Sequence, residues 1–306
     1  MKRILCVLLL AFLLCGCAGY RETDSEYFVT AVCFEKEEKD FKAYIEVLSI
    51  GEDDKKPESR VFTALGKTPY SAVFSTASLM PKNAVFDHCG TAMIHENIKA
   101  EDFKNVMEYL YDTKNLNLGI FMFVTEDIGS VLDCKPQSPS VGYDIMATEE
   151  NVVKTSGISF KNKYYEIRAR EIATGGFCLP FVSVKKDRPE IEGEIIYADY
   201  LPTAQLNRNE AQFFNLIYSG SSGGEISVSG HRCRVNGISS KIKQVGNMLK
   251  AELDCNYRFP SDNKSSKLKK EISELIQSLY GNKALNVLGI ENYELINGAE
   301  VTVSGK

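Results

Sequence analysis

Residues 118–124 read Leu-Gly-Ile-Phe-Met-Phe-Val, a stretch of seven residues without a polar side chain. A short apolar run of this kind is typical of a strand that is buried on both faces of a sheet. The segment Leu118–Val124 therefore predicts a strand in the interior of a sheet.

The residues before this strand alternate between strand and helix patterns. Two helices are predicted from apolar residues at helical spacing, Tyr70–Met80, which ends at Pro81, and Lys99–Leu110. An N-terminal hairpin is predicted from two runs rich in aromatic and β-branched residues, joined by a charged turn at Glu35–Asp40. The predicted strands are Tyr27–Phe34 and Phe41–Leu48 in the hairpin, then Arg60–Leu65, Ala84–Phe86 and Ala92–Ile94.

After the strand, Cys134–Gly142 reads as a loop, and Lys163–Ala173 fits either a helix or a strand. The charged segment Lys185–Pro189 is interpreted as a domain boundary, placed between residues 188 and 189. The second block then repeats the mixture of strands and amphipathic helices, with Gly281 as the residue that closes the last helix. A strand is predicted before the boundary, at Phe177–Val184. The elements predicted after it are strands at Glu194–Tyr197 and Ala299–Val303, an antiparallel sheet of Glu225–Val228, Lys241–Val245 and Leu249–Tyr257, and helices at Asn209–Tyr218 and Ser261–Tyr280.

We therefore predict an α+β fold with several mixed α/β domains, in which helices pack on antiparallel or mixed sheets. Residues 27–188 would form an N-terminal region of two subdomains, and residues 189–306 a C-terminal α+β domain.

The N-terminus has the three parts of an export signal, with Lys2 and Arg3 followed by an uncharged apolar run. That run, Ile4–Leu14, is shorter than the roughly twenty residues of a membrane-spanning helix. The sequence Leu14-Cys15-Gly16-Cys17 fits a lipoprotein signal, so residues 1–16 would be removed and Cys17 lipidated. Residues 17–26 would then form a lipidated tether. Ordinary cleavage after Gly19, without a lipid, is the alternative.

Composition places the remaining chain among globular proteins, with 44% hydrophobic and 25% charged residues. The signal carries two of the 36 basic residues and none of the 41 acidic ones, so the mature chain has a net charge of about −7. This acidic balance argues against a nucleic-acid partner.

Six cysteines remain in the mature body, an even number that permits disulfides in an exported protein. Several lie in apolar strand-like runs, where free cysteine behaves as a small buried hydrophobe. The sequence favours buried thiols and leaves disulfides open. The six are Cys33, Cys89, Cys134, Cys178, Cys233 and Cys255.

The catalytic and ligand-binding motifs that we considered are incomplete or absent in this sequence. Gly66-Lys67-Thr68 resembles the end of a phosphate-binding loop, but Val61 stands where the motif needs glycine. His88 and His95 lack the spacing of a helical metal pair, and the chain contains no Gly-x-Ser-x-Gly. The sequence therefore predicts no metal, no cofactor and no enzymatic activity, and favours a binding or assembly role.

A resemblance adds to this interpretation. The order of several segments behind the lipoprotein signal resembles the C subunit of bacterial spore germinant receptors, the Ger(x)C lipoproteins, although the tryptophan usual after their lipidated cysteine is missing here. The segments are Tyr20-Arg21-Glu22, Gly66-Lys67-Thr68 with the Tyr70–Met80 helix, His88 with Cys89–Ile94, Glu101–Tyr111, Leu118–Val124, Gly193–Tyr197, Asn209–Leu216 and Gly223–Ile226.

The resemblance implies three mixed α/β domains and a non-catalytic lipoprotein on the outer face of the spore inner membrane. It further implies assembly with integral membrane A and B subunits that respond to nutrients, without direct small-molecule binding by this chain. Besides Cys17, the motif positions carried over are Gly66, Thr68 and His88. We interpret these three as structural: a turn glycine, a helix-capping threonine and a hydrogen-bonded histidine.

Two other functions fit an exported protein. The main alternative is an extracytoplasmic solute-binding lipoprotein, which would show a large ligand cleft between two lobes. A surface lipoprotein hydrolase is the other, and it would require convergent titratable groups in a pocket.

Overall fold

The computed structural model describes residues 26–49, 57–113, 116–156, 162–218, 223–258, 265–279, 283–290 and 293–304. The predicted signal, Cys17 and Gly281 lie outside these residues.

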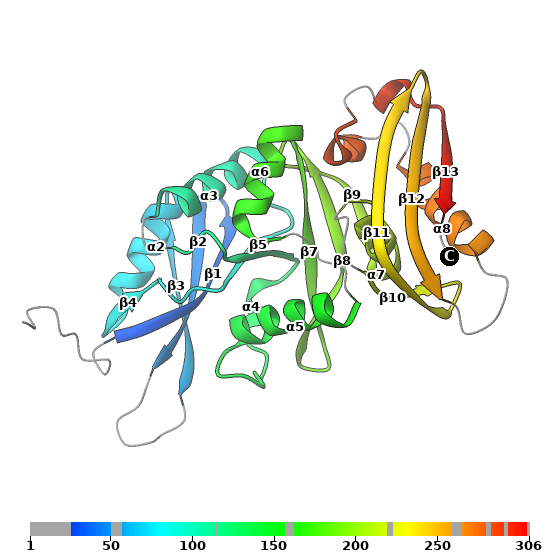
Figure 1. Ribbon diagram of the computed structural model, residues 1–306. Helices are drawn as coiled ribbons and strands as arrows, with labels where there is room; N and C mark the ends of the chain where they lie inside the picture. Colours follow the sequence, from blue (N-terminus) through cyan, green and yellow to red (C-terminus); the bar gives the residue numbers. More distant parts are fainter. Residues whose placement is uncertain are drawn as a thin grey trace, which may run out of the picture.

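A nine-stranded mixed sheet organises the chain up to residue 207 (Figure 1). Its order is β3-β2-β1-β5-β6-β7-β8-β9, and β4 pairs in parallel with the start of β1. The strands β1, β5, β6 and β7 are parallel to one another. The pairs β1–β2, β2–β3, β7–β8 and β8–β9 are antiparallel. The bounds are β1 (Glu26–Glu37), β2 (Asp40–Ser49), β3 (Glu58–Gly66), β4 (Asn83–Val85), β5 (Thr91–His95), β6 (Phe121–Thr125), β7 (Gly176–Lys185), β8 (Arg188–Ala198) and β9 (Leu201–Asn207).

Helices cover both faces of this sheet. One face packs against α2 (Pro69–Ser78), α3 (Ala100–Asp112) and α6 (Tyr164–Thr174). The other face packs against α4 (Ile128–Leu132) and α5 (Val141–Ser156). Alternate residues of the strands point into two separate apolar cores, so each strand near the centre is buried on both sides.

The apolar stretch that predicted the fold forms β6, between β5 and β7. Its residues Met122, Phe123 and Val124 are completely buried. The strand begins at Phe121, three residues later than predicted, because Asn117 closes a turn. The Asn117 Oδ1 atom accepts a hydrogen bond from the Gly119 N–H at 2.8 Å.

The charged segment that we interpreted as a domain boundary is the tip of a hairpin. Residues Lys186 and Asp187 both have a positive φ and join β7 to β8, which pair from Gly176 to Ala198. The predicted boundary after residue 188 thus lies within one sheet instead of in a linker. An exposed hairpin tip and a linker share the same polar composition, which is why the sequence did not separate them.

A second sheet of four strands follows, in the order β10-β11-β12-β13. The first three strands are antiparallel, as predicted, and β13 pairs in parallel with β12. The prediction of an α+β fold is confirmed. The elements of this part are α7 (Arg208–Tyr218), β10 (Gly223–Val228), β11 (His231–Val245), β12 (Met248–Arg258), α8 (Ser265–Ser278), η2 (Lys283–Leu288), η3 (Tyr293–Leu295) and β13 (Gly298–Ser304).

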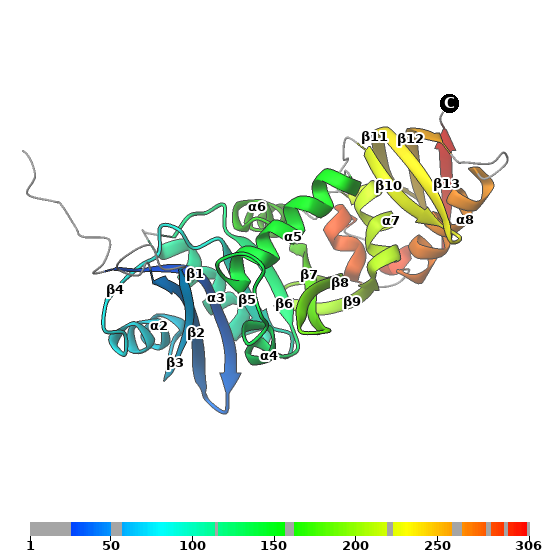
Figure 2. The same ribbon diagram turned by 90° about the horizontal axis from the view of Figure 1, so that it is seen from below.

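The two sheets lie toward opposite ends of an elongated molecule (Figures 1 and 2). Helix α5 contacts both β8 and β10, and the 3-10 helix η2 returns to pack on β7 and β8. A side chain at Gly176 would clash there, since a Cβ atom would lie 2.9 Å from the Val287 nitrogen. Backbone contacts therefore join the C-terminal part closely to the large sheet.

All six cysteines of the mature body are buried and free. The structure thus places thiols, not disulfides, at these positions.

Candidate functional site

Gly66 is the last residue of β3, where helix α2 approaches the strand. A Cβ atom at this position would lie 2.2 Å from the backbone nitrogen of Ala72. The glycine is therefore required by close approach of two backbones, and not by the turn conformation that we predicted.

Thr68 is the N-cap of α2, with extended backbone at φ −130°. Its Oγ1 atom accepts a hydrogen bond from the Ser71 N–H at 3.1 Å, and its own N–H donates to the Ser71 Oγ at 2.9 Å. These reciprocal bonds form a capping box, and Pro69 occupies the first turn, where its missing N–H has no cost.

His88 lies in an exposed segment between β4 and β5. Its ring meets Phe28 edge-on, with the two ring centroids 5.5 Å apart. The part of the chain that the structure describes shows no hydrogen bond from this ring, in contrast to our expectation. The three motif residues thus do not converge on one site, because Thr68 caps α2 whereas the His88 ring lies against Phe28 of β1.

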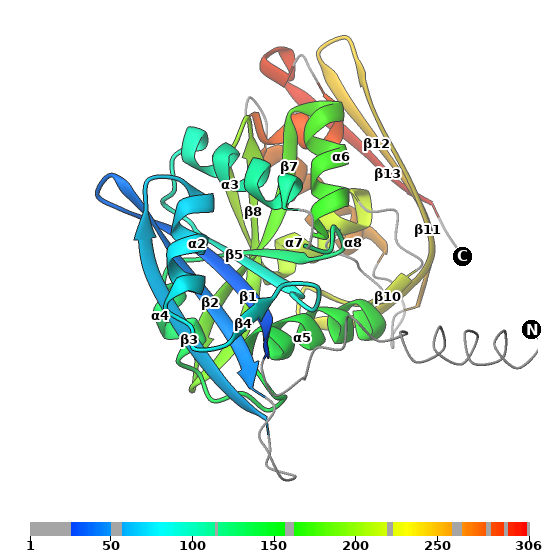
Figure 3. The ribbon, with the colours of Figure 1, turned by 90° about the vertical axis from the view of Figure 1, so that its left-hand side faces the viewer.

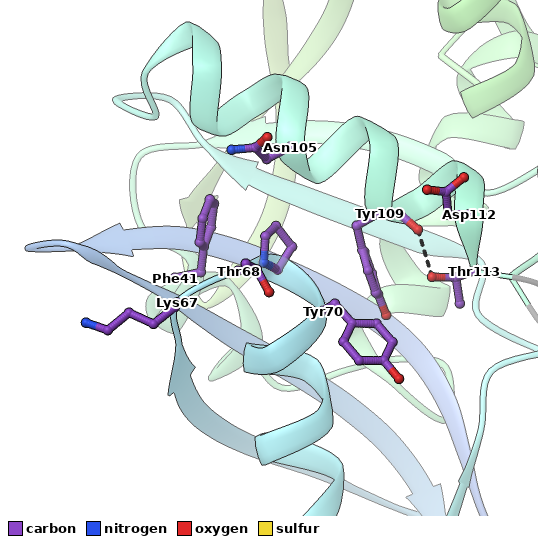
Figure 4. A pocket seen from close by; sticks show the side chains of 9 residues that line it. Phe41, Lys67, Thr68, Tyr70, Asn105, Tyr109, Asp112 and Thr113 are labelled. Carbon is purple, nitrogen blue, oxygen red and sulfur yellow. Dashed lines mark hydrogen bonds between the residues drawn. The ribbon is translucent and has the colours of Figure 1, made fainter.

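A hollow in the described surface lies between the start of α2 and the end of α3 (Figure 4). Its volume is about 830 Å³. Helix α2 and the segment before it contribute one wall, α3 the other, and Phe41 of β2 part of the floor. The lining residues are Phe41, Lys67, Thr68, Pro69, Tyr70, Asn105, Tyr109, Asp112 and Thr113.

The chemistry of this hollow suits contact rather than catalysis. Lys67 Nζ is paired with Asp40 Oδ1 at 2.6 Å, and the Thr113 hydroxyl donates to the Tyr109 carbonyl at 2.7 Å. Burial raises the pKa of Tyr109 to about 12, so its phenol stays neutral. The hollow lies between two helices on one face of a sheet, whereas a solute-binding lipoprotein would hold its ligand between two lobes.

Other candidate nucleophiles are also unsuited to reaction. Burial raises the pKa of the Cys89 thiol to about 12 and those of Cys33 and Cys178 well above their usual value. A thiol must lose its proton to attack, so these groups are inert. Within the described ranges, no cluster of three or more histidine, cysteine or acidic side chains could hold a metal ion.

Two buried carboxyl groups were missed by the sequence analysis. Glu46 on β2 is fully buried and accepts four hydrogen bonds. Its Oε1 accepts from the Ser59 hydroxyl and the Val141 N–H, both at 2.8 Å. Its Oε2 accepts from the Thr30 hydroxyl at 2.7 Å and the Gly142 N–H at 2.8 Å. The carboxylate thus caps the N-terminus of α5, a helix that is distant from β2 in the sequence.

Glu194 on β8 is another buried carboxyl group. Burial away from water raises its pKa to about 8. A hydrogen bond donated by Asn215 Nδ2 on α7, at 3.0 Å, acts in the opposite direction and lowers the pKa. The sequence carries one weak signal for both residues, an acidic side chain directly followed by apolar strand residues. Both have structural roles, since neither faces the hollow.

None of the described helices has the length and apolar character needed to cross a membrane.

Comparison with known families identifies the class more closely. The family model described as the spore germination protein N-terminal domain matches residues 19–184, more than half of the chain. The chain therefore belongs to the family of germinant-receptor C subunits, and the resemblance found in the sequence is confirmed. Among solved structures, the GerBC protein is similar with 12% identity and a TM-score of 0.46, over 90% of this chain and 96% of that chain. The comparison with curated proteins gave no match.

Proposed function

We propose that this protein is a non-catalytic, lipid-anchored subunit of a spore germinant receptor, which assembles with integral membrane A and B subunits to trigger germination in response to nutrients. The family match carries the proposal, because it begins at residue 19, directly after the predicted lipid-bearing Cys17. The anchor would hold the folded body on the outer face of the spore inner membrane.

The chemistry of the described residues supports a role in assembly. The hollow between α2 and α3 holds an ion pair and a neutral phenol, and the buried thiols are protonated. A subunit that acts through contacts needs no reactive group, but it needs a rigid body. The hydrogen-bonded Glu46 carboxylate and the two packed cores supply that rigidity.

Affinity capture tests the assembly directly. The chain carrying a C-terminal tag would be purified from detergent-solubilised spore membranes, with an unrelated tagged lipoprotein as the matched control. We expect two multispanning membrane proteins to co-purify with this chain and not with the control lipoprotein, and to remain bound after washing. Recovery of this chain without any multispanning protein, from spores that germinate normally, would contradict the proposal.

A further inference from the structure

Helix α2 exposes an apolar surface that no other described element covers. Its inner residues Ala72, Val73 and Thr76 pack on the sheet, whereas its outer side carries aromatic rings. Tyr70 is 68% exposed and Phe74 64% exposed, and their rings stack with centroids 6.5 Å apart. Leu79, the C-cap residue, is 61% exposed. Tyr70 and Phe74 on the outer side of the helix, with Leu79 at its C-terminal end, are called the α2 face. Exposed apolar groups that cluster in this way mark contact sites.

The charges around the α2 face differ from those of the whole body. Residues 69–78 contain no charged side chain, although the mature chain has a net charge of about −7. A lysine flanks the helix on either side, Lys67 before it and Lys82 after it. Lys82 lies with its Nζ 5.6 Å from the centre of the Tyr27 ring. An uncharged aromatic helix bounded by lysines suits the interface between lipid headgroups and acyl chains.

The C-terminal end of α2 leads directly to the first described residues of the chain. Strand β4 follows the helix and pairs with the first described residues, Asn83 with Glu26 and Ala84 with Tyr27. Seen from that end of the molecule, α2 crosses in front of β2 and β3 (Figure 3). Only eight residues, 18–25, separate Cys17 from β1, and such a segment spans at most about 26–29 Å.

We propose that the α2 face rests on the membrane surface, with its aromatic side chains among the lipid headgroups. The proposal rests on the lipid anchor of the proposed function. Three side chains bury too little area to bind a bilayer alone, but a short tether makes the contact intramolecular and raises the effective concentration of lipid. The face would fix which side of the protein points to the membrane, and hence which sides remain for its protein partners.

The absence of tryptophan from the sequence gives a sharp test. The variant Phe74→Trp carries one tryptophan in the α2 face. The mature chain would be coupled through the Cys17 thiol to a maleimide lipid, because the six other thiols are buried. The vesicles contain phosphatidylglycerol and phosphatidylcholine with brominated acyl chains. We expect the emission to shift to the blue and to lose intensity, compared with uncoupled protein.

The matched control is Ile172→Trp, which places the reporter on α6 at a side chain that is 71% exposed. We expect no shift and no quenching there. Equal emission of coupled and uncoupled Phe74→Trp, or equal quenching of both variants, would overturn the proposal. Thermal unfolding verifies that both variants fold. The lipid is supplied chemically, so the result is independent of lipidation in cells and of the receptor assignment, which experiments on spores test separately.

Discussion

The Glu46 carboxylate on β2 accepts a hydrogen bond from the backbone N–H of Gly142 at 2.8 Å, across 96 residues of sequence. The bond fixes the first turn of α5 to the large sheet. The same helix contacts β8 and β10, so it connects the N-terminal strands to the second sheet. A single buried carboxylate thus helps to set the arrangement of the whole body.

Replacing this carboxylate by an amide should destabilise the protein. In Glu46→Gln the amide NH₂ group would face N–H and hydroxyl donors that now bond to a carboxylate oxygen. A buried donor without an acceptor costs about 1–3 kcal/mol, and bonds to a charged group are also lost. We expect the free energy of unfolding in urea to fall by about 3 kcal/mol. The exposed Glu58→Gln on β3 is the control, and equal unfolding midpoints for the two variants would refute this role for Glu46.

Glu194 should make stability depend on pH. Its pKa is raised from 4.5 to about 8 in the folded protein, so the native state holds this proton more tightly than the unfolded state. The contribution is fully present below about pH 4.5 and is lost as the pH rises to 8. One pKa unit corresponds to about 1.4 kcal/mol. We therefore expect the free energy of unfolding of Glu194→Gln, relative to that of the wild type, to rise by about 3–5 kcal/mol between pH 5 and pH 8.

Urea unfolding of the wild type and Glu194→Gln at both pH values measures this difference. The exposed Glu190→Gln on the same strand controls for the change of charge. Parallel pH profiles of wild type and Glu194→Gln would show that the buried carboxyl group does not titrate as described.

Gly66→Ala should separate β3 from α2. The added methyl group would lie 2.2 Å from the Ala72 backbone nitrogen, so the helix must move. Overpacking of this kind costs about 1–3 kcal/mol. The control is Gly129→Ala in α4, where the nearest atom lies at 3.4 Å. Thermal unfolding should show a lower Tm for Gly66→Ala only, and an unchanged Tm would mean that the close approach is not required.

The thiols should be present but hidden. In the mature chain with Cys17→Ser, the six buried cysteines should react slowly with an aromatic disulfide reagent under native conditions. Their raised pKa values and burial both lower the thiolate concentration that the reagent can reach. After unfolding without a reductant, all six should react. Fewer than six reactive thiols at that stage would reveal disulfides that the structure does not contain.

Local patterns in the sequence predicted much of the fold. The hairpin of β1 and β2, the helices α2 and α3 and the buried strand β6 each have a periodicity that a single element explains. Helix α5 was missed because Pro136, Pro139 and several serines precede it, and a loop explained this composition equally well. Helix α4 has only five residues, too few to show a helical periodicity. The continuity of the sheet through β7 and β8 depends on long-range pairing, which no local pattern encodes.

The predicted site residues were identified with differing success. Thr68 has a local signal, a polar residue before Pro69 and three residues before Ser71, and it caps the helix. Gly66 owes its importance to the distance between two backbones, which sequence alone does not give. Glu46 acts on α5 through the tertiary fold, so its partners 95 and 96 residues away could not be predicted.

The most direct test of the central claim uses spores of the organism that makes this protein. Release of calcium dipicolinate would be followed after nutrient addition in wild-type spores, in spores with the gene deleted, and in deletion spores that express either the wild-type chain or Cys17→Ala. We predict that deletion abolishes or strongly slows release, that the wild-type chain restores it and that Cys17→Ala does not, while a non-nutrient trigger works in all strains. Normal nutrient-triggered release from the deletion spores, across the nutrients to which the wild type responds, would contradict the assignment of this chain to a germinant receptor.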